Sequence, residues 1–460
     1  CESSNAHFTR LQSAPHSAYS GNITLTLPAS DGDADQFLQS NGSGVMSWAD
    51  AGGGGGNIVD FVASGTLPNG KPVVLKSNGT IEVVATAGAG NVIAAGTPAV
   101  FRAGNTEYIS VTTLTTTKAL VVYRDQSNSS YGTACVLTIS GTSITAGTPV
   151  VFESASMYYP SVIRLTDTKA LVSYQDRGNS SYGTANVINV SGTSITVGTP
   201  VVFNSASSEY VSSTMLNSTK VLVVYRNLGN AGKGTSRILT VQAGSGTNIS
   251  VSAAVLFENA SVYYPEVTAL SATKTIVAYY DAGNSQVFTA CVLDVSGTSI
   301  TAGTPANVTS TAGIGRLSIT TLTTTKALVT YQDNGNSGYG SSNVITVSGS
   351  SISAGSTTIF ESASTSSIAV TKLTDTKGLV TYRDEPNSSN GTSCILDVSG
   401  TSITAGTPVV FEAATTLGTS VTALTATKAM VVYYDGGNGN YGTSCILDNV
   451  IGTSLTSTNF

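Results

Sequence analysis

The chain has 460 residues, of which 10% are charged, and 20 lysines and arginines against 26 aspartates and glutamates give a net charge of −6. This balance lacks the basic footprint of phosphate recognition, so nucleic acid is excluded as an expected partner. A hydrophobic fraction of 40% at low net charge excludes a disordered chain. The apolar runs fall short of the ~20 residues of a transmembrane helix, so no membrane insertion is expected.

The first residues in the chain do not repeat. Residues 23–27 alternate like a strand, and the glycine run at residues 52–56 has the composition of a flexible linker. We expect an assembly or docking region at 1–50, a Gly-rich linker and lead-in at 51–69, and a repeat domain at 70–460. Because 50 residues bury little core, residues 23–27 and Trp48 are expected to pack against other subunits.

Residues 16–28 and 36–48 resemble the N-terminal region of virion structural proteins of tailed phages, particularly those of marine cyanobacteria. Residues 63–81 resemble a lead-in that is common in phage fibre and appendage proteins. The resemblance implies an appendage on the surface of the virion. It also implies a homo-oligomer that contacts other virion proteins through residues 1–50.

A repeat of about 51 residues follows, marked by a Thr-Lys pair before an apolar run. A tyrosine stands five residues after each lysine, and an acid or amide stands two residues after that tyrosine. The seven lysines are Lys118, Lys169, Lys220, Lys274, Lys326, Lys377 and Lys428. The repeat itself also resembles propeller repeats of phage proteins and of bacterial surface proteins.

Each copy contains four strand-like runs. In the first copy these are residues 108–114, a buried run at 119–123, residues 133–140, and an outer-edge run at 144–152 that contains Gly147 and Pro149. Four antiparallel strands per copy, with no helical periodicity, predict an all-β fold and a seven-bladed β-propeller. Residues 91–101 match the fourth run and should pair with strands of residues 420–460, unless residues 70–101 belong to an eighth blade.

Several repeated polar residues have structural interpretations. Cys135, Cys291, Cys394 and Cys445 occupy one position in four copies, too far apart for disulfides, and are expected to be buried free thiols. The aspartate and asparagine after each tyrosine are expected to cap loop amides. A calcium site in these loops is the alternative, although each loop offers one acid, so no metal is expected.

No catalytic site is expected. His7 and His16 are the only histidines, so no histidine-based triad or metal cluster can form within residues 17–460. A glycosidase needs two unique, facing carboxylates, whereas most acids here recur at equivalent positions, which favours a structural role. These acids include Glu153, Glu258, Glu361 and Glu412. No cofactor is implied.

The connections between the fourth run and the next first run differ between copies. Two of them hold Tyr-Tyr-Pro and share a face with the Asp…Asn loops. Tyrosine rings stack on sugars while polar groups fix hydroxyls, although packing against neighbouring loops is the alternative interpretation. The candidate glycan- or receptor-binding residues are Tyr158, Tyr159, Tyr263, Tyr264, Arg124 and Arg226.

The sequence therefore predicts a phage appendage protein whose propeller binds host-surface structures, with glycan as the expected partner. A purely structural decoration protein of tail or capsid is the second hypothesis. A sialidase-like glycosidase is the third.

Overall fold

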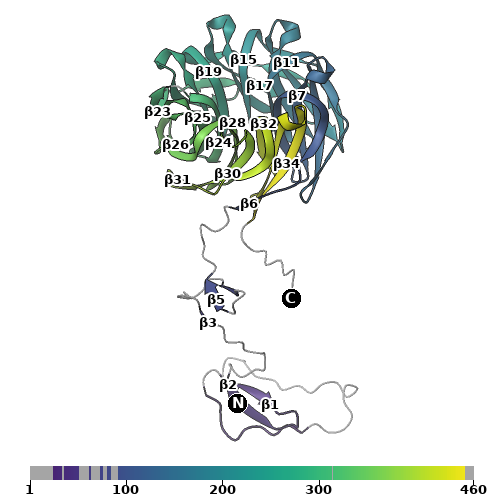
Figure 1. Cartoon of the computed structure of the whole chain (residues 1–460), viewed down its shortest axis with the longest axis vertical. Helices are drawn as coiled ribbons and strands as arrows, with labels where there is room; N and C mark the ends of the chain where they lie inside the picture. Colours follow the sequence, from purple (N-terminus) through teal and green to yellow (C-terminus); the bar gives the residue numbers. More distant parts are fainter. Residues whose placement is uncertain are drawn as a thin grey trace, which may run out of the picture. The chain divides into compact units, whose positions relative to one another are not determined.

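A computed structural model describes residues 24–33, 36–50, 62–63, 73–75, 80–83, 92–312 and 314–450. The chain divides into two compact units, residues 1–87 and residues 88–460. Throughout the described ranges strands dominate, and the helices are single 3₁₀ turns of three residues (Figure 1). The all-β prediction is confirmed. Within the same ranges, no helix has the length and apolar character of a membrane span.

The first unit contains short strands. β1 (Gln36–Ser40) pairs antiparallel with β2 (Met46–Asp50), and β5 (Thr80–Val83) pairs with β3 (Val62–Ala63) and β4 (Val73–Leu75). The Trp48 indole N–H donates to the Ser30 carbonyl at 2.8 Å, and its ring covers Gly32. Trp48 is thus packed within its own unit, whereas Leu25 and Leu27 are exposed. Residue 23 lies outside the described residues.

The second unit is built from the repeats, numbered 1 to 7 by their lysines from Lys118 to Lys428. Each second strand begins at that lysine: β8 (Lys118–Asp125), β12 (Lys169–Asp176), β16 (Lys220–Asn227), β20 (Lys274–Asp281), β25 (Lys326–Asp333), β29 (Lys377–Asp384) and β33 (Lys428–Asp435). The third strands are β9 (Tyr131–Ser140), β13 (Tyr182–Ser191), β17 (Lys233–Val241), β21 (Val287–Ser296), β26 (Tyr339–Ser348), β30 (Asn390–Ser399) and β34 (Tyr441–Val450).

Short outer strands pair with the second halves of the third strands, and all but β6, which precedes the repeats and pairs with β34, follow their partner in the chain. They are β6 (Val92–Ala95), β10 (Ser143–Ala146), β14 (Ser194–Val197), β18 (Ile249–Val251), β22 (Ser299–Ala302), β27 (Ser351–Ala354) and β31 (Ser402–Ala405). The expected fourth strand is therefore interrupted: β10 ends before Gly147, and pairing with β9 resumes at Val150, after Pro149. Proline has no N–H to donate to the ladder, which explains the break.

The expected division between the fourth strand and the next first strand is wrong. Both belong to one long strand: β7 (Ala99–Thr115), β11 (Val150–Thr166), β15 (Val201–Asn217), β19 (Val255–Ser271), β28 (Thr358–Thr374) or β32 (Val409–Ala423). Repeat 5 instead has β23 (Ala306–Ala312) and β24 (Ile314–Thr323). Shifts in register, such as that between Tyr158 and Ser161, bend the long strands from one group of partners to the next. The Tyr-Tyr-Pro segments are thus bent strand, and the expectation of loops there is corrected.

The N-terminal copy pairs with the C-terminal copy, as the sequence predicts. β6 and the start of β7 both pair antiparallel with β34, with Ile93 opposite Asn449 and Val100 opposite Thr443. Figure 1 shows β7 and β34, from opposite ends of this unit, side by side. A side chain also joins repeats 1 and 7, because the Val111 N–H donates to the Ser420 hydroxyl at 3.2 Å. Neighbouring repeats are linked in the same way, for example by the Val162 N–H and the Ser110 hydroxyl.

The core lies between second and third strands of successive repeats. The seven repeat tyrosines are fully buried: Tyr123, Tyr174, Tyr225, Tyr279, Tyr331, Tyr382 and Tyr433. Each packs against a phenylalanine with ring centroids 5.2–5.5 Å apart. Four of the hydroxyls donate to a glutamate, and these acceptors are Glu153, Glu258, Glu361 and Glu412. The expectation of a structural role for these acids is confirmed.

The phenylalanine that packs on Tyr331 of repeat 5 comes from a different strand, the third strand of repeat 4. Elsewhere the ring comes from a long strand and lies against a glycine: a Cβ on Gly183 would lie 2.4 Å from the Phe203 ring. In repeat 4 the glycine position holds Phe288, and the usual phenylalanine position holds Val308. Phe288 packs against Tyr331 at 5.3 Å and is fully buried. The two substitutions therefore exchange a large and a small side chain across the same space.

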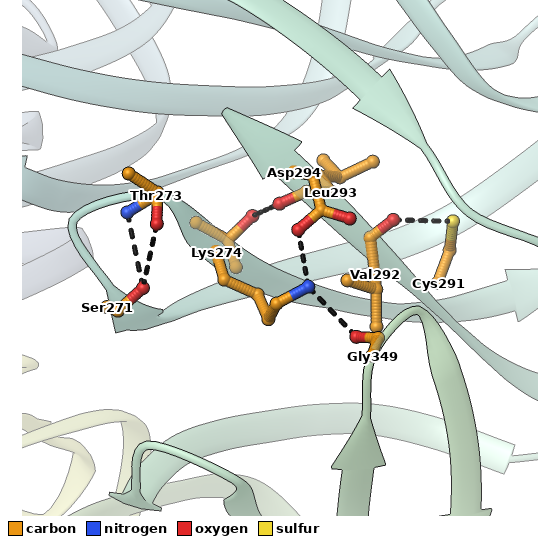
Figure 2. Close-up of polar contacts among 9 residues, drawn as sticks. Ser271, Thr273, Lys274, Cys291, Val292, Leu293, Asp294 and Gly349 are labelled. Carbon is orange, nitrogen blue, oxygen red and sulfur yellow. Dashed lines mark hydrogen bonds and ion pairs between the residues drawn. The ribbon is translucent and has the colours of Figure 1, made fainter. Parts of the chain in front are cut away.

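Several of the Thr-Lys lysines connect one repeat to the next. Lys274 Nζ donates to the Gly349 carbonyl at 2.9 Å and forms an ion pair with Asp294 (Figure 2). The same bond joins Lys220 to Gly297, Lys326 to Gly400, and Lys428 to Gly141, so repeat 7 is joined to repeat 1. These lysines cover carbonyl groups at the turns between third and outer strands.

The repeated cysteines and aspartates also have structural partners. Cys135, Cys291, Cys394 and Cys445 are buried free thiols, and each contacts a glycine carbonyl at 3.1–3.3 Å. Figure 2 includes Cys291. The expected amide capping is present where Asp176, Asp281 and Asp435 accept bonds from the following 3₁₀ turns, η3 (Arg177–Asn179), η5 (Ala282–Asn284) and η7 (Gly436–Asn438). Comparable turns are η2 (Gln126–Asn128), η4 (Leu228–Asn230) and η6 (Asn334–Asn336).

Candidate functional site

A cavity of about 440 Å³ lies where the long strands of different repeats approach one another. One position, ten residues before the lysine, contributes to its wall in most repeats. The residues at this position that line the cavity are Tyr108, Tyr159, Tyr210, Tyr264, Arg316 and Gly418. The volume falls within the ~300–1,000 Å³ typical of small-molecule sites.

Four of the five tyrosines that line the cavity have an unusual backbone. Tyr108, Tyr159, Tyr210 and Tyr264 have φ between 46° and 50°, in the left-handed region. Such a conformation costs a non-glycine residue on the order of 1–3 kcal/mol, and glycine adopts it readily, as Gly418 does with φ 56°. The bend in each strand explains the backbone, but it does not explain why the side chain is tyrosine.

The tyrosines form a continuous series of aromatic contacts. The ring centroids are 5.5 Å apart for Tyr108 and Tyr159, 4.9 Å for Tyr159 and Tyr210, and 4.5 Å for Tyr210 and Tyr264. Burial raises the pKa of Tyr159 to about 12 and also raises the pKa of Tyr108 and Tyr210. The hydroxyls of these three tyrosines therefore stay protonated at neutral pH and can both donate and accept hydrogen bonds.

One acid interrupts a series of serines at the cavity. The position eight residues before the lysine holds serine in five repeats, but Glu266 in repeat 4. The Ser212 hydroxyl donates to Glu266 Oε2 at 2.7 Å. Burial raises the pKa of Glu266 to about 7, against the opposing effects of that hydrogen bond and of Arg316. Glu266 is thus partly protonated near neutral pH.

Arg316 is the cation of the cavity wall. Its side chain is exposed, and it forms no ion pair with any acid in the described ranges. Its charge opposes the rise in the pKa of Tyr108 and Tyr159, which belong to repeats 1 and 2, although Arg316 belongs to repeat 5. The guanidinium is therefore within electrostatic range of residues from several repeats.

The six predicted residues fall into two groups. Tyr159 and Tyr264 line the cavity, whereas Tyr158 and Tyr263 lie beneath arginines and do not line it. The Arg124 guanidinium carbon is 4.3 Å from the Tyr158 ring centroid, and that of Arg226 is 4.2 Å from Tyr263. Each stack brings together a predicted tyrosine and a predicted arginine, as expected for one face of the molecule.

The two arginines are already engaged. Arg124 forms an ion pair with Glu107 at 3.2 Å, and Arg226 forms one with Glu209 at 2.7 Å. A guanidinium also occupies a face of each stacked tyrosine, so Tyr158 and Tyr263 are poorly placed to stack on a ligand. The structure favours Tyr159 and Tyr264 over the other four predicted residues.

Sequence reasoning missed several cavity residues. Tyr108 and Tyr210 were visible as aromatics at the same position but were not selected, and Glu266, Arg316 and Tyr434 were not considered. The available signal was the variation at the positions ten and eight residues before each lysine. Its importance depends on those positions meeting at one cavity. The described residues contain no cluster of three or more His, Cys, Asp or Glu side chains that could hold a metal ion.

Comparisons with known proteins give a similarity in structure alone. No family model matches the chain, and no curated protein matches its sequence. BP39L lectin from Burkholderia pseudomallei is similar with a TM-score of 0.53 and 10% identity, over 76% of this chain and 97% of that one. At this identity the similarity concerns the fold.

Two further solved structures are more distant by TM-score. A protein of unknown function from Dyadobacter fermentans has a TM-score of 0.49 and 12% identity, over 78% of this chain and 99% of that one. AofleA from Arthrobotrys oligospora has a TM-score of 0.43 and 7% identity, over 68% of this chain and 91% of that one.

Proposed function

We propose that the repeat unit is a seven-bladed β-propeller that binds carbohydrate in its tyrosine-lined cavity. The propeller arrangement is supported by the pairing of β34 with β6 and β7, and by the Lys428–Gly141 bond between repeats 7 and 1. The position-by-position recurrence of strands, lysines and core tyrosines supports seven equivalent blades. The similarity to a lectin is consistent with carbohydrate binding by such a fold.

The observation that carries the proposal is the set of four tyrosines held at positive φ around one cavity. Their rings provide apolar faces, while the phenol hydroxyls, Glu266 and Arg316 provide polar groups. Sugars present an apolar ring face together with directional hydroxyls, and this combination suits such a wall. Backbone strain that persists at a cavity is a recognised indication of function.

Binding is favoured over hydrolysis. A glycosidase of the usual kind uses two carboxyl groups on either side of the bond that is cleaved. Among the described cavity residues the carboxyl groups belong to Glu107 and Glu266, and Glu107 is engaged by Arg124 at 3.2 Å. Glu266 therefore has no free carboxylate partner among these residues with which it could form the catalytic pair of a glycosidase. We therefore propose a binding protein and not an enzyme, requiring no cofactor.

We further propose that the chain is an appendage protein on the surface of a tailed-phage particle, where it attaches to host-surface glycan. This part rests on the resemblance of residues 16–28, 36–48 and 63–81 to phage virion and appendage proteins. It includes the proposals that residues 1–50 contact other virion proteins and that the chain is a homo-oligomer. The exposed Leu25 and Leu27 agree with such contacts.

The experiment compares two matched double variants of the full chain on an array of bacterial surface glycans. We expect Tyr159→Ala with Tyr264→Ala to weaken binding at least tenfold, because both rings leave the cavity wall. Tyr158→Ala with Tyr263→Ala, which alters the adjacent tyrosine of each pair, should retain most binding. Circular dichroism and thermal unfolding check that both variants fold.

The proposal has a clear contrary outcome. If the folded wild-type chain binds no glycan on the array and no host-cell surface, carbohydrate binding is wrong and a structural role gains support. If binding survives loss of Tyr159 and Tyr264 but not of Tyr158 and Tyr263, the site is at the arginine stacks. Release of reducing sugar from a bound glycan would instead indicate a hydrolase.

A further inference from the structure

The chemical asymmetry of the cavity restricts the ligand further, and this inference rests on the proposed carbohydrate binding. Near-identical repeats would give a cavity with equivalent walls. Two adjacent repeats break this equivalence: Glu266 replaces a serine in repeat 4, and Arg316 replaces a tyrosine in repeat 5. At these two positions a ligand meets a cation and an acid where the equivalent positions of most other repeats hold tyrosine and serine, and this asymmetry fixes its orientation.

Arg316 is placed to receive an anionic group. The residue before it, Gly315, packs closely against Gln332. A Cβ on residue 315 would lie 2.1 Å from Gln332 Oε1. The other arginines beside the cavity tyrosines, Arg124 and Arg226, are each paired with a glutamate, whereas Arg316 is exposed and forms no ion pair within the described residues. A guanidinium in this state can form two parallel hydrogen bonds to a carboxylate.

We propose that the cavity binds a sugar unit bearing a carboxylate, with Arg316 pairing with that carboxylate and the cavity tyrosines contacting the sugar ring. A single negative charge is favoured over a dianionic phosphate because Glu107 and Glu266 also line the cavity and repel negative charge. Glu266 lies beside the same ligand as a hydrogen-bonding group, held by the Ser212 hydroxyl at 2.7 Å.

The test measures affinities of the full chain for three matched pairs of sugars: glucose and glucuronate, galactose and galacturonate, mannose and mannuronate. Each pair differs by the carboxylate, so calorimetric titration isolates its contribution. At pH 6 we expect at least one acid to bind tenfold or more tightly than its neutral partner. Arg316→Ala should lower the affinity for the acid to about that of its neutral partner, so that the difference is lost, while Arg164→Ala, a surface control paired with Asp167, should keep the difference.

A second readout comes from pH. The charged groups that line the cavity with Glu266 are Arg316 on β24, which acts on the Glu266 carboxyl, and Glu107 on β7. The phenols of Tyr108, Tyr159, Tyr210 and Tyr434 keep their protons because burial raises their pKa values. Ionisation of Glu266 above pH 7 adds negative charge beside the ligand carboxylate. Affinity for the acidic sugar should therefore fall several-fold between pH 6 and pH 8, and Glu266→Gln should largely abolish this fall.

The outcomes separate the two proposals. Preferential binding of neutral sugars, or an acid preference unchanged in Arg316→Ala, overturns the carboxylate inference while carbohydrate binding stands. Absence of binding to all six probes counts against the inference, and absence on the wider glycan array as well overturns carbohydrate binding itself. If the affinity of Glu266→Gln for the acidic sugar falls with pH as much as that of the wild type, Glu266 does not lie beside the ligand carboxylate.

Discussion

The four tyrosines at positive φ combine an unfavourable backbone conformation with a place in the cavity wall. Tyr108, Tyr159, Tyr210 and Tyr264 share a backbone conformation that Gly418 adopts in repeat 7 without a side chain. Each tyrosine gains aromatic contacts with its neighbours, which offset part of the strain. The position tolerates glycine, so the four tyrosines are better explained by the chemistry of the cavity than by the requirements of the bend.

Glu266 gives a prediction about stability that is independent of any ligand. Its pKa is raised from an ordinary 4.5 to about 7, so the folded chain holds this proton more tightly than the unfolded chain does. The contribution of Glu266 to stability is therefore fully present below pH 4.5 and is lost as the pH rises through 7. Glu266→Gln should stabilise the protein by about 2 kcal/mol at pH 8 and by little at pH 4.5.

Thermal unfolding at the two pH values measures this difference. Asp167→Asn serves as the control, because Asp167 forms an exposed pair with Arg164 and should change stability by less than about 1 kcal/mol. A destabilised Glu266→Gln at pH 8 would mean that the charged form is favoured in the fold, contrary to the assignment.

The burial of individual repeat residues could be predicted from the sequence where it depends on the local pattern alone. The burial of the seven tyrosines and the four cysteines follows from their recurrence in apolar runs. The cavity could not be derived in this way. Arg316 and Tyr108 are separated by about 200 positions, and only the arrangement of the long strands brings their charges and hydroxyls into range.

At the scale of elements, the long strands show why local sequence was misleading. Val150 to Thr166 reads as two strands with a connection, yet it forms one strand whose pairing changes from β9 to β12. Polar residues and Pro160 within it favoured a loop. The bend is accommodated by shifts in register and by the left-handed Tyr159, neither of which has a strong sequence signal.

The exchanged side chains of repeat 4 predict a compensating pair of mutations. Phe288→Gly removes the ring that packs on Tyr331 and should destabilise the protein by about 3–5 kcal/mol. Val308→Phe alone should also destabilise, because Phe288 already fills the space. Together the two changes recreate the arrangement of the other repeats, and the double variant should recover at least half of the loss.

A double-mutant cycle by denaturant unfolding measures the coupling between the two positions. Strictly additive effects would show that Phe288 and Val308 do not share one space. Phe360→Ala in the neighbouring repeat provides a reference for the cost of losing such a ring against its tyrosine, Tyr382.

For the molecule as a whole, the bonds between the first and last repeats predict unequal effects of two deletions. Removal of residues 88–98 takes away β6, leaving the outer half of β34 without a partner and Cys445 without the Gly96 carbonyl. This deletion should lower the melting temperature of the repeat unit by at least several degrees and promote aggregation through the free edge. Removal of residues 1–60 should leave that melting temperature nearly unchanged, because those residues belong to the other unit.

Calorimetry of both shortened chains beside the full chain provides the comparison. If loss of residues 88–98 leaves the transition unchanged, the pairing of β6 with β34 contributes little, and the connection between repeats 7 and 1 rests on the pairing of β7 with β34 and on side chains. Sedimentation of the chain lacking residues 1–60 reports in the same experiment on whether those residues support an oligomer.

The pairing of β6 with β34 also has a consequence during synthesis. Val92 to Ala95 leave the ribosome about 350 residues before the strand with which they pair, Tyr441–Val450. At ~5–20 residues per second, translation of that interval takes roughly 20–70 s. During this time repeats 1 to 6 can form in order, each beside its completed predecessor, while β6 waits with unpaired backbone groups. Until Tyr441–Val450 emerges, β6 is therefore an open strand edge of the kind that can pair with other chains.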